Sequence, residues 1–175
     1  MAEARNGSRL ARALARRRVL LGFVFGLVAV WIAHPTPRTL VVGAAIAACG
    51  EALRIWAAGH LEKGREVTSS GPYRFTRHPL YLGSTIMGVG LAVASASVVV
   101  GAIVLAYLAA TLTAAIRSEE AQLTERFGDA YPEYRSGKRR GASRRFSVRR
   151  AIANREYRAL SGLAAVLALL IWKAL

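Results

Sequence analysis

Two short stretches of the chain concentrate residue types that bind charged groups and move protons. Arg77 and His78 stand together in the first stretch, and Glu119 and Glu120 stand together in the second. Arginine and histidine attract an anion, and a histidine or a carboxylate can act as a general base. These four residues therefore predict a polar site, provided that the chain brings the two stretches together.

A long apolar run between the two stretches supplies that connection. The 37 residues from Leu80 to Ile116 include no charged side chain, which is too many for one membrane crossing but suits two short ones. The Ser95-Ala96-Ser97 segment is the natural place for the chain to turn. Because such a hairpin is antiparallel, His78 at its start and Glu120 at its end lie on the same side of the membrane.

The composition of the whole chain is that of one integral membrane domain, residues 1–175. Apolar residues make up 54% of the sequence, yet the formal net charge is +15, so apolar and basic residues occupy separate stretches. We predict an all-α, polytopic transmembrane bundle of about five helices whose cytoplasmic loops form the site. The expected helices cover residues 19–33, 39–58, 80–96, 98–116 and 160–173.

The basic residues predict the orientation of this bundle. In the five-helix arrangement, 22 of the 25 lysines and arginines fall on one side. The positive-inside rule then places the N-terminus in the cytoplasm and the C-terminus outside, most simply in a bacterial inner membrane. The only cysteine, Cys49, lies in an apolar run, so we expect no multi-cysteine metal site and no metal ion.

The segment from Lys138 to Arg150 is strongly basic and allows two interpretations. It could be a solvated loop that orients the protein. Alternatively it lies on anionic phospholipid, with Phe146, Val148 and Ile152 toward the acyl chains. Nucleic-acid binding is not expected, because no stacking aromatic residues accompany the charge. Nothing in the sequence indicates the oligomeric state.

Glu51 and Arg54 are charged residues inside an apolar segment, at i, i+3 spacing. Ionisable groups in a membrane are costly unless they are paired or face the protein interior. One interpretation is a pair that fixes the helix near its cytoplasmic end. The other has Arg54 facing the site and holding an acidic group of a substrate.

The pattern of both stretches resembles the isoprenylcysteine carboxyl methyltransferase family and the related phospholipid methyltransferases. The first motif, G-P-Y-R-x-x-R-H-P-x-Y-x-G, runs from Gly71 to Gly83, and the second, E-E-x-x-L followed by F-G-x-x-Y-x-x-Y, runs from Glu119 to Tyr134. The resemblance implies an S-adenosylmethionine-dependent enzyme with its cofactor near the cytoplasmic face. It also implies a lipid or isoprenoid acceptor that enters from the membrane and is methylated on a carboxylate or an amine.

The resemblance assigns roles to individual residues. Glu120, with Glu119 beside it, would hold the ammonium or ribose hydroxyls of the cofactor. Gly88 and Gly90 could contact the cofactor or only allow close helix packing, and Tyr131 and Tyr134 could be pocket walls or interfacial anchors. The full expected cofactor set is Tyr73, Arg77, His78, Pro79, Tyr81, Gly88, Gly90, Glu120, Tyr131 and Tyr134. The expected catalytic set is Arg54, Glu119 and Arg135.

Two other functions compete with this one. Sterol reductases are similar around an R-H-P-x-Y-x-G helix start, which would make the chain a nicotinamide-dependent membrane reductase. A non-catalytic membrane scaffold is the third class. For the methyltransferase, an acceptor tail should enter sideways, between the hairpin and helix two or five, near Ala57 or Ala164, because the small residues of the hairpin predict close packing within it.

Overall fold

The computed structural model describes residues 26–62, 68–128 and 143–175, with residues 126 and 127 described by their backbone alone. Helices are the regular elements of these ranges, which confirms the all-α prediction. Residues 26–32 form a short helical segment. The elements that follow are α2 (Pro37–His60), the 3-10 turn η1 (Gly71–Arg74), α3 (Pro79–Ser95), α4 (Val98–Phe127), α6 (Val148–Ala153) and α7 (Tyr157–Ala174).

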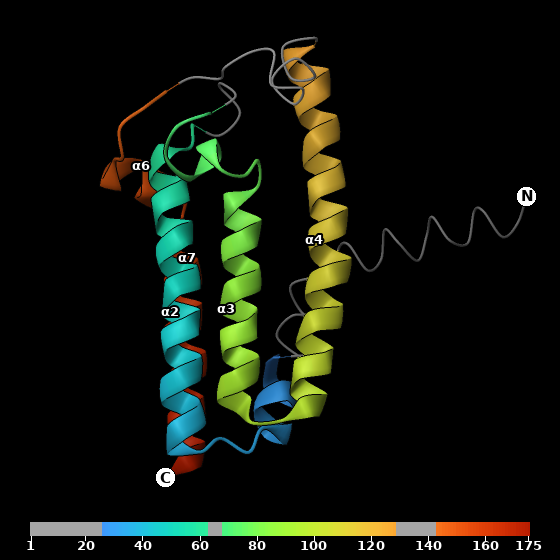
Figure 1. Ribbon diagram of the computed structural model, residues 1–175, viewed down its shortest axis with the longest axis vertical. Coiled ribbons are helices and arrows are strands. Elements are labelled where there is room, and N and C mark those ends of the chain that lie inside the picture. Colours follow the sequence, from blue (N-terminus) through green and yellow to red (C-terminus); the bar gives the residue numbers. More distant parts are fainter. Residues whose placement is uncertain (1–25, 63–67, 129–142) are drawn as a thin grey trace, which may run out of the picture.

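Three of these helices are long and apolar enough to cross a membrane: Pro37–His60, Val98–Glu125 and Tyr157–Ala174. The fourth long helix, α3, is apolar but has only 17 residues. Figure 1 shows the four helices lying roughly parallel, with the ends of α2 and α4 and the starts of α3 and α7 at the same end of the molecule. The α3–α4 turn and the C-terminus lie at the other end. The first sequence motif and the described part of the second therefore lie at one end of the bundle.

Local chemistry explains where α2, α3 and α4 begin and end. At the start of α2, Thr36 and Thr39 exchange side-chain to backbone hydrogen bonds of 3.0 and 3.2 Å. The turn predicted between the hairpin helices is confirmed, since Ala96 is left-handed with a φ of 49° and Ser97 caps α4 through the amide of Val100. The local sequence thus determines where α3 ends and where α4 begins.

The structure differs from the expected helices at the end of α4 and in an additional short helix. Helix α4 does not end near Ile116 but continues to Phe127, because the residues beyond the apolar run are good helix formers until Gly128, which has a φ of 51°. The short helix α6 was not expected, since its six residues carry too little apolar periodicity to predict a helix. Glu119 and Glu120 consequently lie on a helix rather than on a loop.

Helices α2 and α3 approach one another more closely than the two helices of the hairpin do. A Cβ on Gly50 would lie 2.5 Å from the amide nitrogen of Met87, and one on Gly90 would lie 2.4 Å from that of Ala47. Between α3 and α4 the corresponding contact is to a flexible side chain, with a Cβ on Gly88 lying 2.5 Å from Leu108 Cδ1. Small residues thus allow backbone contact between α2 and α3, which leaves no opening at these positions. An opening between the hairpin and the last helix stays a prediction.

Candidate functional site

His78 and Glu120 are in contact at the open end of the hairpin, where α3 begins and α4 approaches its end. Nε2 of His78 lies 3.3 Å from Oε1 of Glu120, and Nη1 of Arg77 lies 3.8 Å from the same oxygen. The side chains of His78 and Glu120 are about one-fifth exposed, whereas that of Arg77 is 45% exposed. The structure thus brings together the first and second motifs, as expected from the antiparallel hairpin.

The start of helix α3 holds this group in place. His78 is the N-terminal capping residue, and its carbonyl oxygen accepts hydrogen bonds from the amides of Tyr81 and Leu82 at 3.1 and 3.0 Å. Its own amide donates to Thr76 Oγ1 at 3.3 Å. Pro79 is fully buried at the first helical position, where its missing N–H costs no intrahelical bond. His78 is therefore fixed by the backbone on both sides.

Tyr81 extends the same site toward the second carboxylate. The rings of His78 and Tyr81 have their centroids 5.7 Å apart with an interplanar angle of 34°. The Tyr81 side chain lies close enough to the carboxylate of Glu119 for the two to interact electrostatically. Five residues, which we call the hairpin cluster, thus combine two basic groups, two carboxylates and a phenol: Arg77, His78, Tyr81, Glu119 and Glu120.

Tyr73 lies near this cluster in sequence, on the turn η1, and its side chain is half-buried. The turn is held against the end of α2. Gly71 has a φ of 59°, and a Cβ there would lie 2.6 Å from Nδ1 of His60, so both its backbone conformation and its position require glycine. His60 itself is buried and hydrogen-bonds to the carbonyl oxygen of Trp56 at 2.9 Å, which is a structural role.

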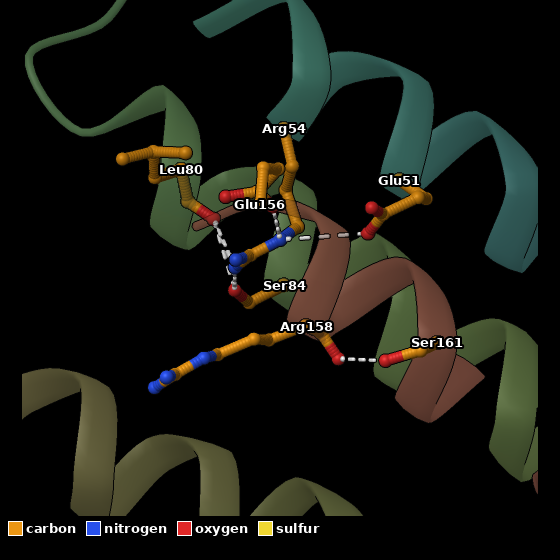
Figure 2. Close-up of polar contacts among 7 residues, drawn as sticks. All are labelled: Glu51, Arg54, Leu80, Ser84, Glu156, Arg158 and Ser161. Carbon is orange, nitrogen blue, oxygen red and sulfur yellow. Dashed lines mark hydrogen bonds and ion pairs between the residues drawn. The ribbon is translucent and has the colours of Figure 1, made fainter. Parts of the chain in front are cut away.

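A second polar network lies beside the first turn of α3 and is centred on Arg54 (Figure 2). Nε of Arg54 donates to Oε1 of Glu156 at 2.6 Å, and Nη1 donates to Ser84 Oγ and, at 3.4 Å, to the carbonyl oxygen of Leu80. Ser84 Oγ also donates to that carbonyl at 2.9 Å. Arg54 therefore connects α2 with the turn of α3 that follows His78 and with the start of α7.

Glu156 and Ser84 are the residues of this network that the sequence analysis missed. Glu156 is 6% exposed and is the residue directly before α7. A signal for it was present, because an arginine inside an apolar segment needs a counter-ion and Glu156 is an acidic residue next to the last apolar run. Ser84 gave no such signal, since serine is common in close-packed membrane helices.

Glu51 is the weaker partner of Arg54. Its Oε2 lies 3.6 Å from Arg54 Nε, but neither carboxylate oxygen has a hydrogen-bond partner among the described residues, and the residue is 2% exposed. A buried carboxylate normally has such partners. The i, i+3 pair expected from the sequence is therefore present but loose, and Arg54 is bound chiefly by Glu156.

Among the described residues of the predicted set, Gly88 and Gly90 do not join the hairpin cluster. Gly88 lies against α4 and Gly90 against α2, and both are packing contacts within the bundle. Tyr131, Tyr134 and Arg135 lie outside the described residues, so their expected roles stay predictions. No group of three or more histidine, cysteine or acidic side chains that could hold a metal ion occurs within the described ranges.

The fold and the hairpin cluster together define a helical membrane protein with a charged site at one end of its bundle. The model of the family described as phospholipid methyltransferase matches residues 18–130, which include both helices of the hairpin and all five residues of the cluster. The chain therefore belongs to the phospholipid methyltransferase family and is an integral membrane protein. This match confirms the resemblance carried by the two motifs.

A curated relative is the nickel-cobalt-cadmium resistance protein NccN of Alcaligenes xylosoxydans xylosoxydans. It is 32% identical to this chain over 99 residues, which are 55% of this chain and 45% of that protein. The match thus spans less than half the length of the relative. No solved structure matches the chain.

Proposed function

We propose that this protein is an S-adenosylmethionine-dependent methyltransferase that acts on an isoprenoid or phospholipid-like acceptor at the cytoplasmic face of the membrane. One observation carries the proposal. The two motifs of the methyltransferase family, on either side of a long apolar hairpin, meet at the 3.3 Å contact between His78 and Glu120. Membership of the family indicates that the reaction is a methyl transfer. The hairpin cluster is the candidate site for that reaction.

The hairpin cluster has the donor set that this cofactor requires. Arg77 and His78 offer positive charge for its carboxylate, and Glu119 and Glu120 offer negative charge for its ammonium and ribose hydroxyls. In the structure these opposite charges neutralise one another, as the contacts of Arg77 and His78 with Glu120 show. A zwitterionic ligand can replace such a pair without leaving either charge unpaired.

S-adenosylmethionine, when bound, supplies a methyl group on a sulfonium for in-line displacement. The residues of this chain then have to align the acceptor and exclude water. A carboxylate acceptor is already ionised at neutral pH and needs no base. An ammonium acceptor must lose a proton first, and the Glu119 carboxylate or His78 Nε2 is the candidate base that would receive it.

The acceptor tail is expected to approach from the lipid side. Exposed apolar side chains line α4, with Val99 at 55% and Leu105 at 52% exposure, so an alkyl chain can lie against this helix. Access between α2 and α3 is closed by their glycine contacts. Of the two positions considered for lateral access, Ala57 is fully buried and Ala164 on α7 is exposed.

The cytoplasmic, inner-membrane location rests on the distribution of charge. The end of the bundle that carries the hairpin cluster also carries Arg74, Arg77 and the basic residues from Arg144 to Arg158. The opposite end carries Arg38 and Lys173. By the positive-inside rule, this asymmetry favours a cytoplasmic site and an outside C-terminus.

The test is a binding titration of S-adenosylmethionine with the purified full chain in detergent micelles. Wild-type protein should bind it, and the demethylated product should compete. His78→Ala and Glu120→Ala should each weaken binding by about 1.5–3 kcal/mol, because each removes a charge-assisted hydrogen bond. Glu125→Ala, which removes an exposed carboxylate further along α4, and His34→Ala, at the other end of the bundle, should bind as wild type does.

Two results would contradict the proposal. One is unchanged affinity in both His78→Ala and Glu120→Ala when their melting temperatures match the wild type. The other is binding of a nicotinamide cofactor in place of S-adenosylmethionine, which would favour the reductase class.

A further inference from the structure

A cavity of about 450 Å³ lies between the C-terminal end of α2 and the segment around α6. None of the residues that line it belongs to the hairpin cluster or to the network of Arg54. Two are arginines and one is acidic, and the complete lining is Leu61, Glu62, Arg150, Ala153, Asn154 and Arg155. The cavity is therefore a separate feature of the same end of the bundle.

The walls of this cavity are held by specific hydrogen bonds. The side-chain amide of Asn154 donates to the carbonyl oxygens of Ala58 and Leu61, both at 2.9 Å, and Arg150 Nε donates to that of Gly59 at 2.9 Å. These bonds satisfy carbonyl groups that the end of α2 would otherwise leave unpaired. Both side chains thus have fixed positions in the wall.

Arg150 and Arg155 differ in how their charges are compensated. Arg150 Nη1 lies 3.8 Å from Oε1 of Glu62, so these two charges offset one another. Arg155 makes no ion pair with any described residue, although it lines the same cavity. Its backbone is left-handed, with a φ of 61°, because Arg155 ends α6: its amide and that of Glu156 donate to the carbonyl oxygens of Ile152 and Ala151 at 2.9 and 3.2 Å. Among the described residues, the cavity therefore has one positive charge without an ion-pair partner.

Exposed apolar side chains lie on α6, the helix that also carries Arg150 and Ala153 of the cavity wall. Val148 and Ile152, one turn apart on α6, are 62% and 58% exposed. Phe146 anchors the segment, since its ring lies over Gly59 and 6.0 Å from the ring of His60. Exposed apolar residues next to arginines are typical of a segment at the interface between head groups and acyl chains.

We propose that this cavity binds the phosphate of an anionic membrane phospholipid, whose acyl chains lie against Val148 and Ile152. Arg155 supplies the charge that selects an anionic head group, and Asn154 and Arg150 shape the wall around it. A zwitterionic lipid would bring its own cation into a cavity that already has a surplus positive charge. The proposal does not depend on the reaction that the hairpin cluster performs.

The test compares lipids and variants by native mass spectrometry of the full chain released from detergent. Wild-type protein should bind phosphatidylglycerol in preference to phosphatidylcholine. Arg155→Asn should lower the affinity for phosphatidylglycerol about fivefold, the effect of one basic residue near an anionic surface. Asparagine is chosen because it tolerates the left-handed conformation. Arg155→Lys keeps the charge and should stay within about twofold of wild type.

Arg149→Asn is the matched control, since Arg149 is exposed on α6 and does not line the cavity. It should change the affinity less than twofold, because its side chain does not line the cavity. Equal losses in Arg149→Asn and Arg155→Asn would overturn the proposal in favour of general surface attraction. Equal binding of the two lipids by wild type would overturn it without any variant, and so would displacement of phosphatidylglycerol by inorganic phosphate, which would indicate a free-phosphate site.

Discussion

The guanidinium of Arg54 is held by groups of the protein, which favours a positioning role over the substrate-binding role considered from the sequence. Its Nε and Nη1 are engaged by Glu156, Ser84 and the carbonyl oxygen of Leu80. Leu80 and Ser84 belong to the turn of α3 that directly follows His78 and Tyr81. We therefore expect Arg54 to act as a positioning residue, which holds the start of α3 relative to α2 and α7.

The two carboxylates near Arg54 should differ in their effect on stability. Glu156→Gln removes the 2.6 Å ion pair and leaves a buried arginine with only the loose contact to Glu51, which should cost about 3 kcal/mol. Glu51→Gln leaves the stronger pair intact and should change stability by no more than about 1 kcal/mol. Thermal unfolding in detergent, followed by circular dichroism, measures both. A larger loss of stability in Glu51→Gln than in Glu156→Gln would show that Glu51 is the main partner of Arg54.

At the scale of elements, the closest contact in the bundle is between α2 and α3. Gly50→Ala should lower stability by about 1–3 kcal/mol, because the added Cβ meets backbone atoms of Met87 and Gly83 at 2.5 and 2.7 Å. Gly162→Ala on α7 is the control, since a Cβ there meets nothing within 4 Å and should raise helix stability slightly. Equal melting temperatures of the two variants would mean that α2 and α3 separate readily.

The sequence predicted the elements better than their contacts. The apolar run from 80 to 116 and its small-residue turn were enough to predict the hairpin. Its antiparallel course was then enough to predict that His78 and Glu120 lie close together. The end of α4 was missed because apolar content marks a membrane boundary and not a helix end. The partner of Arg54 was missed because α2 is apolar nearly all round, so its pattern does not fix which side faces α7.

At the scale of the whole molecule, the structure supports a definite membrane topology. The end of α2 and the start of α6 lie at one end of the bundle, and the α3–α4 turn and the C-terminus lie at the other (Figure 1). Reporters fused after Leu61 or Ser143 should therefore be cytoplasmic, and reporters fused after Ser97 or Leu175 should be outside. A cytoplasmic reporter at Leu175 would require that α7 does not cross the membrane.

The unequal lengths of α3 and α4 make the site sensitive to the thickness of the bilayer. The 17 residues of α3 span about 26 Å, less than a typical hydrocarbon core of about 30 Å, whereas the 30 residues of α4 span about 45 Å. Figure 1 shows the end of α4 extending past the start of α3. Longer acyl chains would therefore draw His78, together with Glu120 in contact with it, beneath the head groups, and activity should fall as the lipid chains lengthen.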